Sequence, residues 1–98
     1  MIVAEMGSAV VGFGELILKT REVRAVYVSP RAVRKGVGSA LLNELERIAR
    51  ENGLTDLHLG ASLNGVPFYE KHAYCVVGDR MMTTNGVHSP YVAMAKTW

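Results

Sequence analysis

Hydrophobic and polar positions along the chain repeat with two different periods, one typical of strands and one typical of helices. Early in the chain, three short runs are rich in β-forming residues and predict strands, namely Met1–Glu5, Ala9–Leu18 and Glu22–Ser29. The turn signal Gly7-Ser8 lies between the first two runs and predicts a hairpin. Gly12 and Gly14 interrupt the second run and indicate a bulge there.

The segment Gly38–Asn52 has the pattern of an amphipathic helix. Its apolar residues recur at helical spacing and are Leu41, Leu42, Leu45, Ile48 and Ala49. Glu46 and Arg50 lie four positions apart, and we expect them to form an ion pair on the solvent face. Gly53 follows the last periodic residue, where a glycine commonly ends a helix.

The second half of the chain alternates between the two patterns. Strands are predicted over Leu54–Gly60, Tyr74–Asp79 and Tyr91–Lys96. Val66–His72 predicts a short helix that opens around Pro67, and a polar connection between the last two strands contains the turn pair Asn85-Gly86. The predicted order is β-β-β-α-β-α-β-β, which indicates an α/β (α+β) fold with helices packed against a sheet.

The composition indicates one small domain, residues 1–98. Hydrophobic residues make up 49% of the chain and charged residues 20%, which suits a packed core. The net charge of +2 is too balanced to indicate binding to nucleic acid. The single cysteine, Cys75, cannot form an internal disulfide, and no apolar run is long enough for a membrane span. We therefore expect a cytoplasmic protein with no nucleic-acid or membrane partner.

The stretch from Val28 to Leu42 combines a strand end, a basic loop with glycines and the start of the helix. Unpaired backbone N–H groups at a helix start attract anions, and Gly36 and Gly38 let phosphate oxygens approach the backbone. Such a segment suits a diphosphate. A dinucleotide-binding fold would need a third glycine, and a P-loop would need Gly-Lys-Ser/Thr, so neither pattern fits. The remaining alternative is a tight turn without a ligand.

This stretch resembles the pyrophosphate loop of the GNAT (Gcn5-related N-acetyltransferase) superfamily, Gln/Arg-x-x-Gly-x-Gly/Ala after a strand that ends in Val-x-Pro. The resemblance implies a mixed, mostly antiparallel twisted sheet with two helices, and acetyl-CoA as cosubstrate. Val33 departs from the pattern, which prefers Gln or Arg, and Arg34 or Lys35 could compensate. The implied cofactor-binding residues are Val26, Tyr27, Val28, Val33, Arg34, Lys35, Gly36, Val37, Gly38, Ser39, Asn64 and Tyr69.

A second stretch, Asn64 to Tyr74, is similar to the family pattern Asn-x-x-Ala-x-x-Phe-Tyr-Glu-Lys-x-Gly-Phe. In the family, the asparagine contacts the pantetheine region and the tyrosine protonates the departing thiolate. The resemblance therefore implies that Asn64 binds the cofactor and that Tyr69 is the general acid. Ala73 replaces the usual glycine, so we expect strain from a positive φ at this position.

The general base is predicted less directly. Glu22 matches the position of a catalytic glutamate in several family members, and it lies six residues before Val28, hence on the same face if the strand is regular. A solvated charge at the strand edge is the alternative interpretation. Glu15 is a weaker candidate, and many family members use bases that act through water.

A full GNAT domain begins with another strand and two helices, whereas Met1–Glu5 already matches the second strand of the family. The resemblance therefore identifies a truncated domain, which is a natural short form, a fragment or half of a split protein. An uncovered sheet edge favours a homodimer. The predicted activity is acetyl transfer to a primary amine acceptor of a small molecule or peptide by direct attack. The alternative is a non-catalytic acyl-CoA-binding or interaction module.

Overall fold

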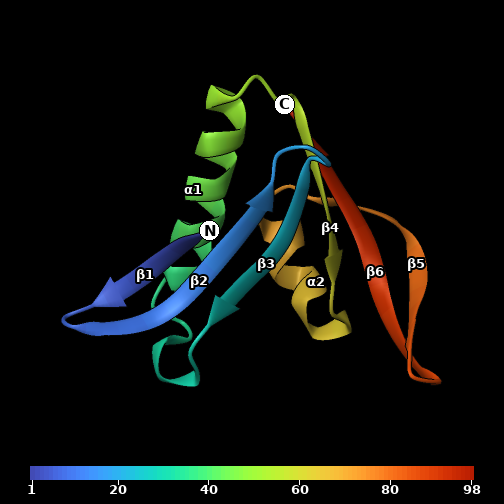
Figure 1. The fold of residues 1–98 in the computed structure, drawn as a ribbon, viewed down its shortest axis with the longest axis horizontal. Coiled ribbons are helices and arrows are strands. Elements are labelled where there is room, and N and C mark those ends of the chain that lie inside the picture. Colours follow the sequence, from blue (N-terminus) through green and yellow to red (C-terminus); the bar gives the residue numbers. More distant parts are fainter. The chain divides into compact units, whose positions relative to one another are not determined.

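The computed structural model describes residues 1–98, which divide into two compact units, Met1–Leu57 and His58–Trp98 (Figure 1). Six strands and two α-helices follow one another in the order β-β-β-α-β-α-β-β. The strand pairs within each unit are antiparallel wherever their register is defined. The predicted element order and the α/β fold class are confirmed.

The first unit contains three antiparallel strands and one long helix. The strands are β1 (Ile2–Met6), β2 (Ala9–Ile17) and β3 (Glu22–Val28), and the helix is α1 (Val37–Glu51). β2 lies between β1 and β3, and α1 packs on all three strands. A cluster of buried apolar residues, Val11, Ala32, Val37 and Leu41, joins the helix to the strands. Ile2, Ala4, Val26 and Val28 pack against this cluster.

Gly12 and Gly14 serve close packing and are not bulge residues. A Cβ atom at Gly12 would lie 2.6 Å from the Tyr27 carbonyl oxygen, and one at Gly14 would lie 3.0 Å from Leu45 Cδ1. The register instead shifts at two other positions, where Val11 and Arg24 are the extra residues opposite β1 and β2 respectively. Such bulges add one residue to one strand and reverse the facing of the side chains that follow.

The predicted apolar face of helix α1 is confirmed, but the predicted position of Glu46 on the solvent face is wrong. Glu46 is only 3% exposed, so it does not lie on the solvent face. Its position four residues after Leu42 and three before Ala49 places it on the same stripe as those buried residues. The Arg50 guanidinium remains exposed and lies 3.8 Å from the Glu46 carboxylate.

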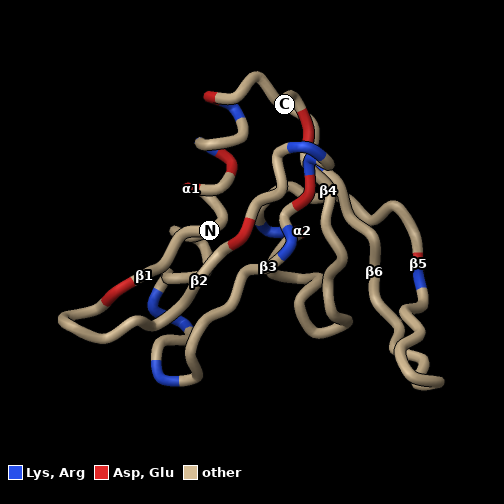
Figure 2. Tube along the Cα trace, viewed as in Figure 1, with Lys and Arg blue, Asp and Glu red and all other residues tan.

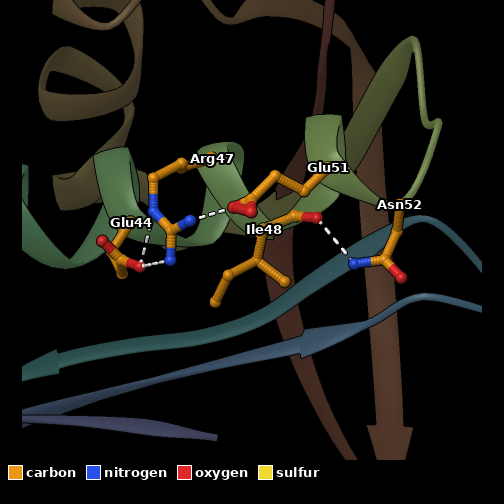
Figure 3. A network of polar contacts seen from close by, with 5 residues as sticks. All are labelled: Glu44, Arg47, Ile48, Glu51 and Asn52. Carbon is orange, nitrogen blue, oxygen red and sulfur yellow. Dashed lines mark hydrogen bonds and ion pairs between the residues drawn. The ribbon is translucent and has the colours of Figure 1, made fainter.

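The solvent face of α1 carries a different ion-pair network (Figure 3). The Arg47 guanidinium lies between two carboxylates and pairs with Glu44 and with Glu51. Hydrogen bonding by Arg47 lowers the pKa of the Glu44 carboxyl. At the end of the helix, Asn52 Nδ2 donates to the Ile48 carbonyl oxygen at 2.8 Å. Spacings of three and four residues bring these side chains to one side of the helix.

The second unit contains a long hairpin and a short helix. Its elements are β4 (Asp56–Ala61, which starts at the end of the first unit), the 3₁₀ turn η2 (Leu63–Gly65), α2 (Val66–Lys71), β5 (Cys75–Thr84) and β6 (Val87–Thr97). The strand order is β4-β6-β5. The last two strands are longer than predicted because Asn85 and Gly86 both adopt positive φ and close a two-residue hairpin that extends the pairing to the turn.

The two α-helices end in the same backbone motif with different residues at the left-handed position. After α1, Gly53 has φ +79°, and the N–H groups of Gly53 and Leu54 donate to the carbonyls of Arg50 and Ala49. After α2, Ala73 has φ +70°, and the N–H groups of Ala73 and Tyr74 donate to Glu70 and Tyr69. Both are Schellman motifs, in which glycine is the favoured residue. The expected strain at Ala73 is confirmed.

We predict that Ala73→Gly stabilises the protein, because glycine adopts positive φ without the clash of a Cβ atom. The gain is about 1 kcal/mol, which corresponds to a rise in Tm of roughly 4–8 °C for a domain of this size. Gly53→Ala is the matched control, since no atom lies within 4 Å of its added Cβ and the φ cost alone lowers the Tm. Thermal unfolding followed by circular dichroism measures both variants, and an unchanged or lower Tm for Ala73→Gly would contradict the prediction.

Candidate functional site

The end of β3 and the loop after it carry the predicted cofactor-binding residues of the first unit. Val26 and Val28 face α1 and pack against its core cluster. Tyr27 points to the opposite face, is 50% exposed and stacks on Phe13 with the ring centroids 5.4 Å apart. The Ser29 N–H donates to the Val11 carbonyl at 2.7 Å, which continues the pairing of β3 to the start of the loop.

The loop is held by a short 3₁₀ turn, η1 (Pro30–Ala32). Ser29 caps this turn, since its carbonyl accepts from Ala32 N at 2.8 Å and its hydroxyl accepts from Arg31 N. Ala32 is 1% exposed and anchors the loop in the core cluster. Arg34 and Gly36 then adopt positive φ, +65° and +77°, and turn the chain into α1.

The start of α1 is open to a ligand. Its N-cap residue is Gly36, and no side chain caps the helix or places an acidic group in its first turn. Ala40 N makes the hydrogen bond to the Gly36 carbonyl at 3.0 Å, so helix geometry leaves the N–H groups of Val37 and Gly38 without carbonyl partners in the helix. Arg34 and Lys35 are exposed beside it, and the nearest acidic residue that follows in the chain is Glu44. In Figure 2, the loop between β3 and α1 carries basic positions and no acidic one. The helix macrodipole and the side-chain charges therefore both favour an anion at the start of α1.

The two carboxylates considered as bases lie on the same face of the sheet, opposite α1. Glu22 pairs with Ile17, and Glu15 pairs with Ala25, in the row of cross-strand pairs that also contains Phe13 and Tyr27. The prediction that Glu22 shares a face with Val28 is wrong, because the extra residue Arg24 reverses the alternation between them. Arg24 Nε lies 3.8 Å from the Glu15 carboxylate.

The second unit holds Asn64 and Tyr69. Asn64 is exposed in η2, which Ser62 caps by accepting from Gly65 N with its hydroxyl at 3.1 Å. A Cβ atom at Gly65 would lie 3.7 Å from Tyr69 Cε2, so the turn passes directly beside the ring of Tyr69. Within this unit, η2 and α2 therefore bring the asparagine-bearing turn next to the candidate acid.

Tyr69 is a half-buried residue of α2 among other aromatic rings. Its ring makes edge contacts with Phe68 and Tyr74 at centroid distances of 5.0 and 5.8 Å. Burial of the phenol raises its pKa above the usual value near 10, because desolvation disfavours the phenolate. The hydroxyl therefore keeps its proton at neutral pH and can donate it. Its backbone carbonyl accepts from both His72 and Tyr74 and fixes the end of the helix.

Sequence reasoning missed two features of these units. The bulge at Arg24 leaves no signal in the pattern of apolar residues, because the extra residue is polar and exposed. An open groove in the second unit, lined by residues of η2, β5 and β6, was also missed because it forms from residues distant in sequence. Among the described residues, no group of three or more His, Cys, Asp or Glu side chains is placed to hold a metal ion. No helix has the length and apolar character needed to cross a bilayer.

Comparisons with known proteins give the family. The model of the acetyltransferase (GNAT) domain matches residues 1–98. The uncharacterized N-acetyltransferase YjcF of Bacillus subtilis (strain 168) is 34% identical over 61 residues, which are 62% of this chain and 42% of that protein. A GCN5-related N-acetyltransferase from Rhodopseudomonas palustris superposes on 98% of this chain with a TM-score of 0.93 and 28% identity.

A third relative was solved with a ligand. The PaiA N-acetyltransferase from Thermoplasma acidophilum, in complex with coenzyme A, covers 98% of this chain with a TM-score of 0.73 and 27% identity. This chain spans 59% of the Rhodopseudomonas protein and 58% of the Thermoplasma protein. The family match and these likenesses confirm the GNAT-like fold. The chain belongs to the GNAT family of acetyltransferases, for which acetyl-CoA is the cosubstrate.

Proposed function

We propose that this chain binds acetyl-CoA and transfers its acetyl group to a primary amine of a small molecule or peptide. The single observation that carries the proposal is the uncapped start of α1, reached through a basic loop at the end of β3. Three features of that segment suit a pyrophosphate: the N–H groups of Val37 and Gly38, which have no helical partners, the positive end of a 15-residue helix, and two exposed cations. The exposed free thiol of Cys75 is consistent with a reducing cytoplasm.

The proposed reaction needs three groups of the protein. The amine nitrogen attacks the carbonyl carbon of the thioester. A backbone N–H near the end of β3 stabilises the negative charge that develops on the carbonyl oxygen. The carbon–sulfur bond then breaks, and the departing sulfur takes a proton from the Tyr69 hydroxyl. The proton lost by the attacking nitrogen passes to Glu22, directly or through water. Glu15 lies on the same face of the sheet and is the second candidate for this role.

We also propose that the protein works as a homodimer. The face of the first unit opposite α1 presents an apolar row across three strands, formed by Val3, Phe13 and Tyr27. Val3 is 54% exposed and Tyr27 50%, and β1 is an edge strand. A second copy would cover the edge of β1 and Val3 beside it, which otherwise favour association with other chains.

The cofactor proposal predicts micromolar binding of acetyl-CoA in isothermal titration calorimetry. Replacement of Arg34 and Lys35 by alanine should weaken binding about tenfold, since each exposed charge pair contributes up to about 1 kcal/mol. The control replaces Lys19 and Lys71 by alanine, which removes two positive charges outside the loop. No binding by the folded wild-type chain would reject the proposal. Binding without transfer to any amine would instead support a non-catalytic acyl-CoA-binding module.

The role of Tyr69 predicts that Tyr69→Phe lowers kcat by about 10²–10⁴-fold with little change in acetyl-CoA affinity. Because the pKa of the buried phenol is raised, the wild-type proton is lost only as the pH rises above about 10, so kcat should fall there and not earlier. Steady-state rates from pH 6 to 11 measure both effects. Tyr74→Phe removes a hydroxyl from the neighbouring ring and should leave kcat within about threefold. An active Tyr69→Phe variant would exclude Tyr69 as the acid.

The dimer proposal predicts a sedimenting mass of twice the 10.7 kDa chain. Val3→Lys should shift the equilibrium to monomer, because it places like charges at the apolar row of both copies. Val87→Lys changes another exposed valine, at the far end of the β5–β6 hairpin, and serves as the control. A monomeric wild-type protein at 100 µM, about the concentration of a routine sedimentation experiment, would contradict the proposal.

A further inference from the structure

The second unit contains an open groove of about 490 Å³ that is separate from every residue assigned a role above. Its walls come from η2 and from the middle of the β5–β6 hairpin, and its lining residues are Leu63, Asp79, Arg80, Met81, Pro90 and Tyr91. The volume lies in the range of small-molecule sites. Four of the six residues are apolar or aromatic, and Arg80 supplies a positive charge.

The Arg80 side chain is held in place by the backbone of its own strand. Nη1 donates to the Asp79 carbonyl oxygen at 3.0 Å. Its guanidinium lies over Gly78, where an added Cβ atom would be 2.6 Å from Nη1. A Cβ atom at position 78 would therefore displace the guanidinium, which is the end of a flexible side chain. A guanidinium has five N–H donors, so most of them remain available after this single bond.

Arg80 has no ion-pair partner among the residues of the structure. The neighbouring residue Asp79 also lines the groove, but it pairs with Val92 whereas Arg80 pairs with Tyr91, so the two side chains leave the hairpin on opposite faces. The guanidinium therefore has no carboxylate paired with it on the Tyr91 face. A carboxylate matches a guanidinium in geometry and charge, and the two commonly form paired hydrogen bonds.

The aromatic wall of the groove is also fixed by a glycine. A Cβ atom at Gly60 of β4 would lie 2.9 Å from Tyr91 Cδ2, so the Tyr91 ring lies across the bare backbone of β4. On this face, Gly60, Tyr91 and Arg80 follow one another across the three strands of the unit. An apolar surface formed by a ring thus lies directly beside a cation. This pairing suits a molecule with an apolar part and a carboxylate.

The groove borders the part of the unit that carries the candidate acid. Leu63 belongs to η2 together with Asn64 and Gly65, and Gly65 contacts the ring of Tyr69. η2 continues directly into α2, where Tyr69 lies. A molecule held against Leu63 is therefore held beside the turn that supports Tyr69.

We propose that this groove binds the acceptor, and that the acceptor is an apolar amine that also carries a carboxylate, which pairs with Arg80. The apolar part lies on Leu63 and Tyr91. The assignment of this ligand as the acetyl acceptor rests on the proposed acetyltransferase function. The binding itself does not, because it needs only residues of the second unit.

The test compares L-phenylalanine with L-phenylalaninamide, which differ only in the carboxylate. Each is titrated into the full chain without acetyl-CoA, and backbone amide signals of Leu63, Arg80 and Tyr91 are followed by nuclear magnetic resonance. We expect the carboxylate to bind at least about tenfold more tightly, as a charge-assisted hydrogen bond allows. Arg80→Gln should abolish the difference. Gly78→Ala should reduce it although the charge remains, because the added Cβ displaces the guanidinium.

Lys71→Gln is the control, since it removes one positive charge from the same unit outside the groove. It should keep the preference for the carboxylate. Equal affinity of the wild type for both probes, absence of saturable binding, or a preference that survives in a folded Arg80→Gln variant would each overturn the proposal. If phenylalanine binds but acetyl-CoA does not, the acetyltransferase proposal fails and the binding site stands. If acetyl-CoA binds and neither probe does, the groove proposal fails and the cofactor proposal stands.

Discussion

Close contact between α1 and β2 is the constraint on which the first unit depends. At Gly12 and Gly14 the strand has no side chains, and the space they leave is filled by Leu41, Val37 and Leu45 of the helix. A methyl group at Gly12 would already meet the Tyr27 carbonyl of β3 at 2.6 Å, so the position tolerates nothing larger than hydrogen. Since interiors are packed to the density of organic crystals, such contacts fix the helix against the sheet to within a fraction of an ångström.

That packing determines where the start of α1 lies. Val37, the first helical residue, is buried in the core cluster with Ala32 and Val11, so both ends of the loop between β3 and α1 are anchored. Between these anchors, the residues from Val33 to Gly36 are exposed, and two of them have positive φ. The loop therefore combines fixed ends with an accessible backbone. A binding site for a diphosphate requires this combination, because donors that are already positioned lose little entropy on binding.

The second unit uses glycines for a different purpose. Gly60 and Gly78 are covered by side chains of the same unit, Tyr91 and Arg80, and each glycine determines the orientation of the group above it. At both places, the missing Cβ atom lets an aromatic ring or a guanidinium lie against the backbone. Functional side chains become oriented in this way without a dedicated layer of supporting side chains.

The sequence by itself determined the order of the elements, the apolar face of α1, the stop at Gly53, the strain at Ala73 and the turn at Asn85-Gly86. These features depend on local periodicity or on the φ of a single residue, and both are encoded within a few positions. The two loop motifs that indicated the GNAT family are local in the same sense, and the family match confirmed that interpretation.

Only the tertiary structure decided the facing of Glu22, the burial of Glu46 and the existence of the Arg80 groove. A single extra residue at Arg24 moves Glu22 to the other face of β3, and nothing in the alternation of residue types records it. Glu46 is buried because of what packs on α1, not because of its own polarity. The groove joins Leu63 of η2 to hairpin residues that lie 16–28 positions further along the chain. Contacts of this range are set by packing between elements, which local sequence patterns do not contain.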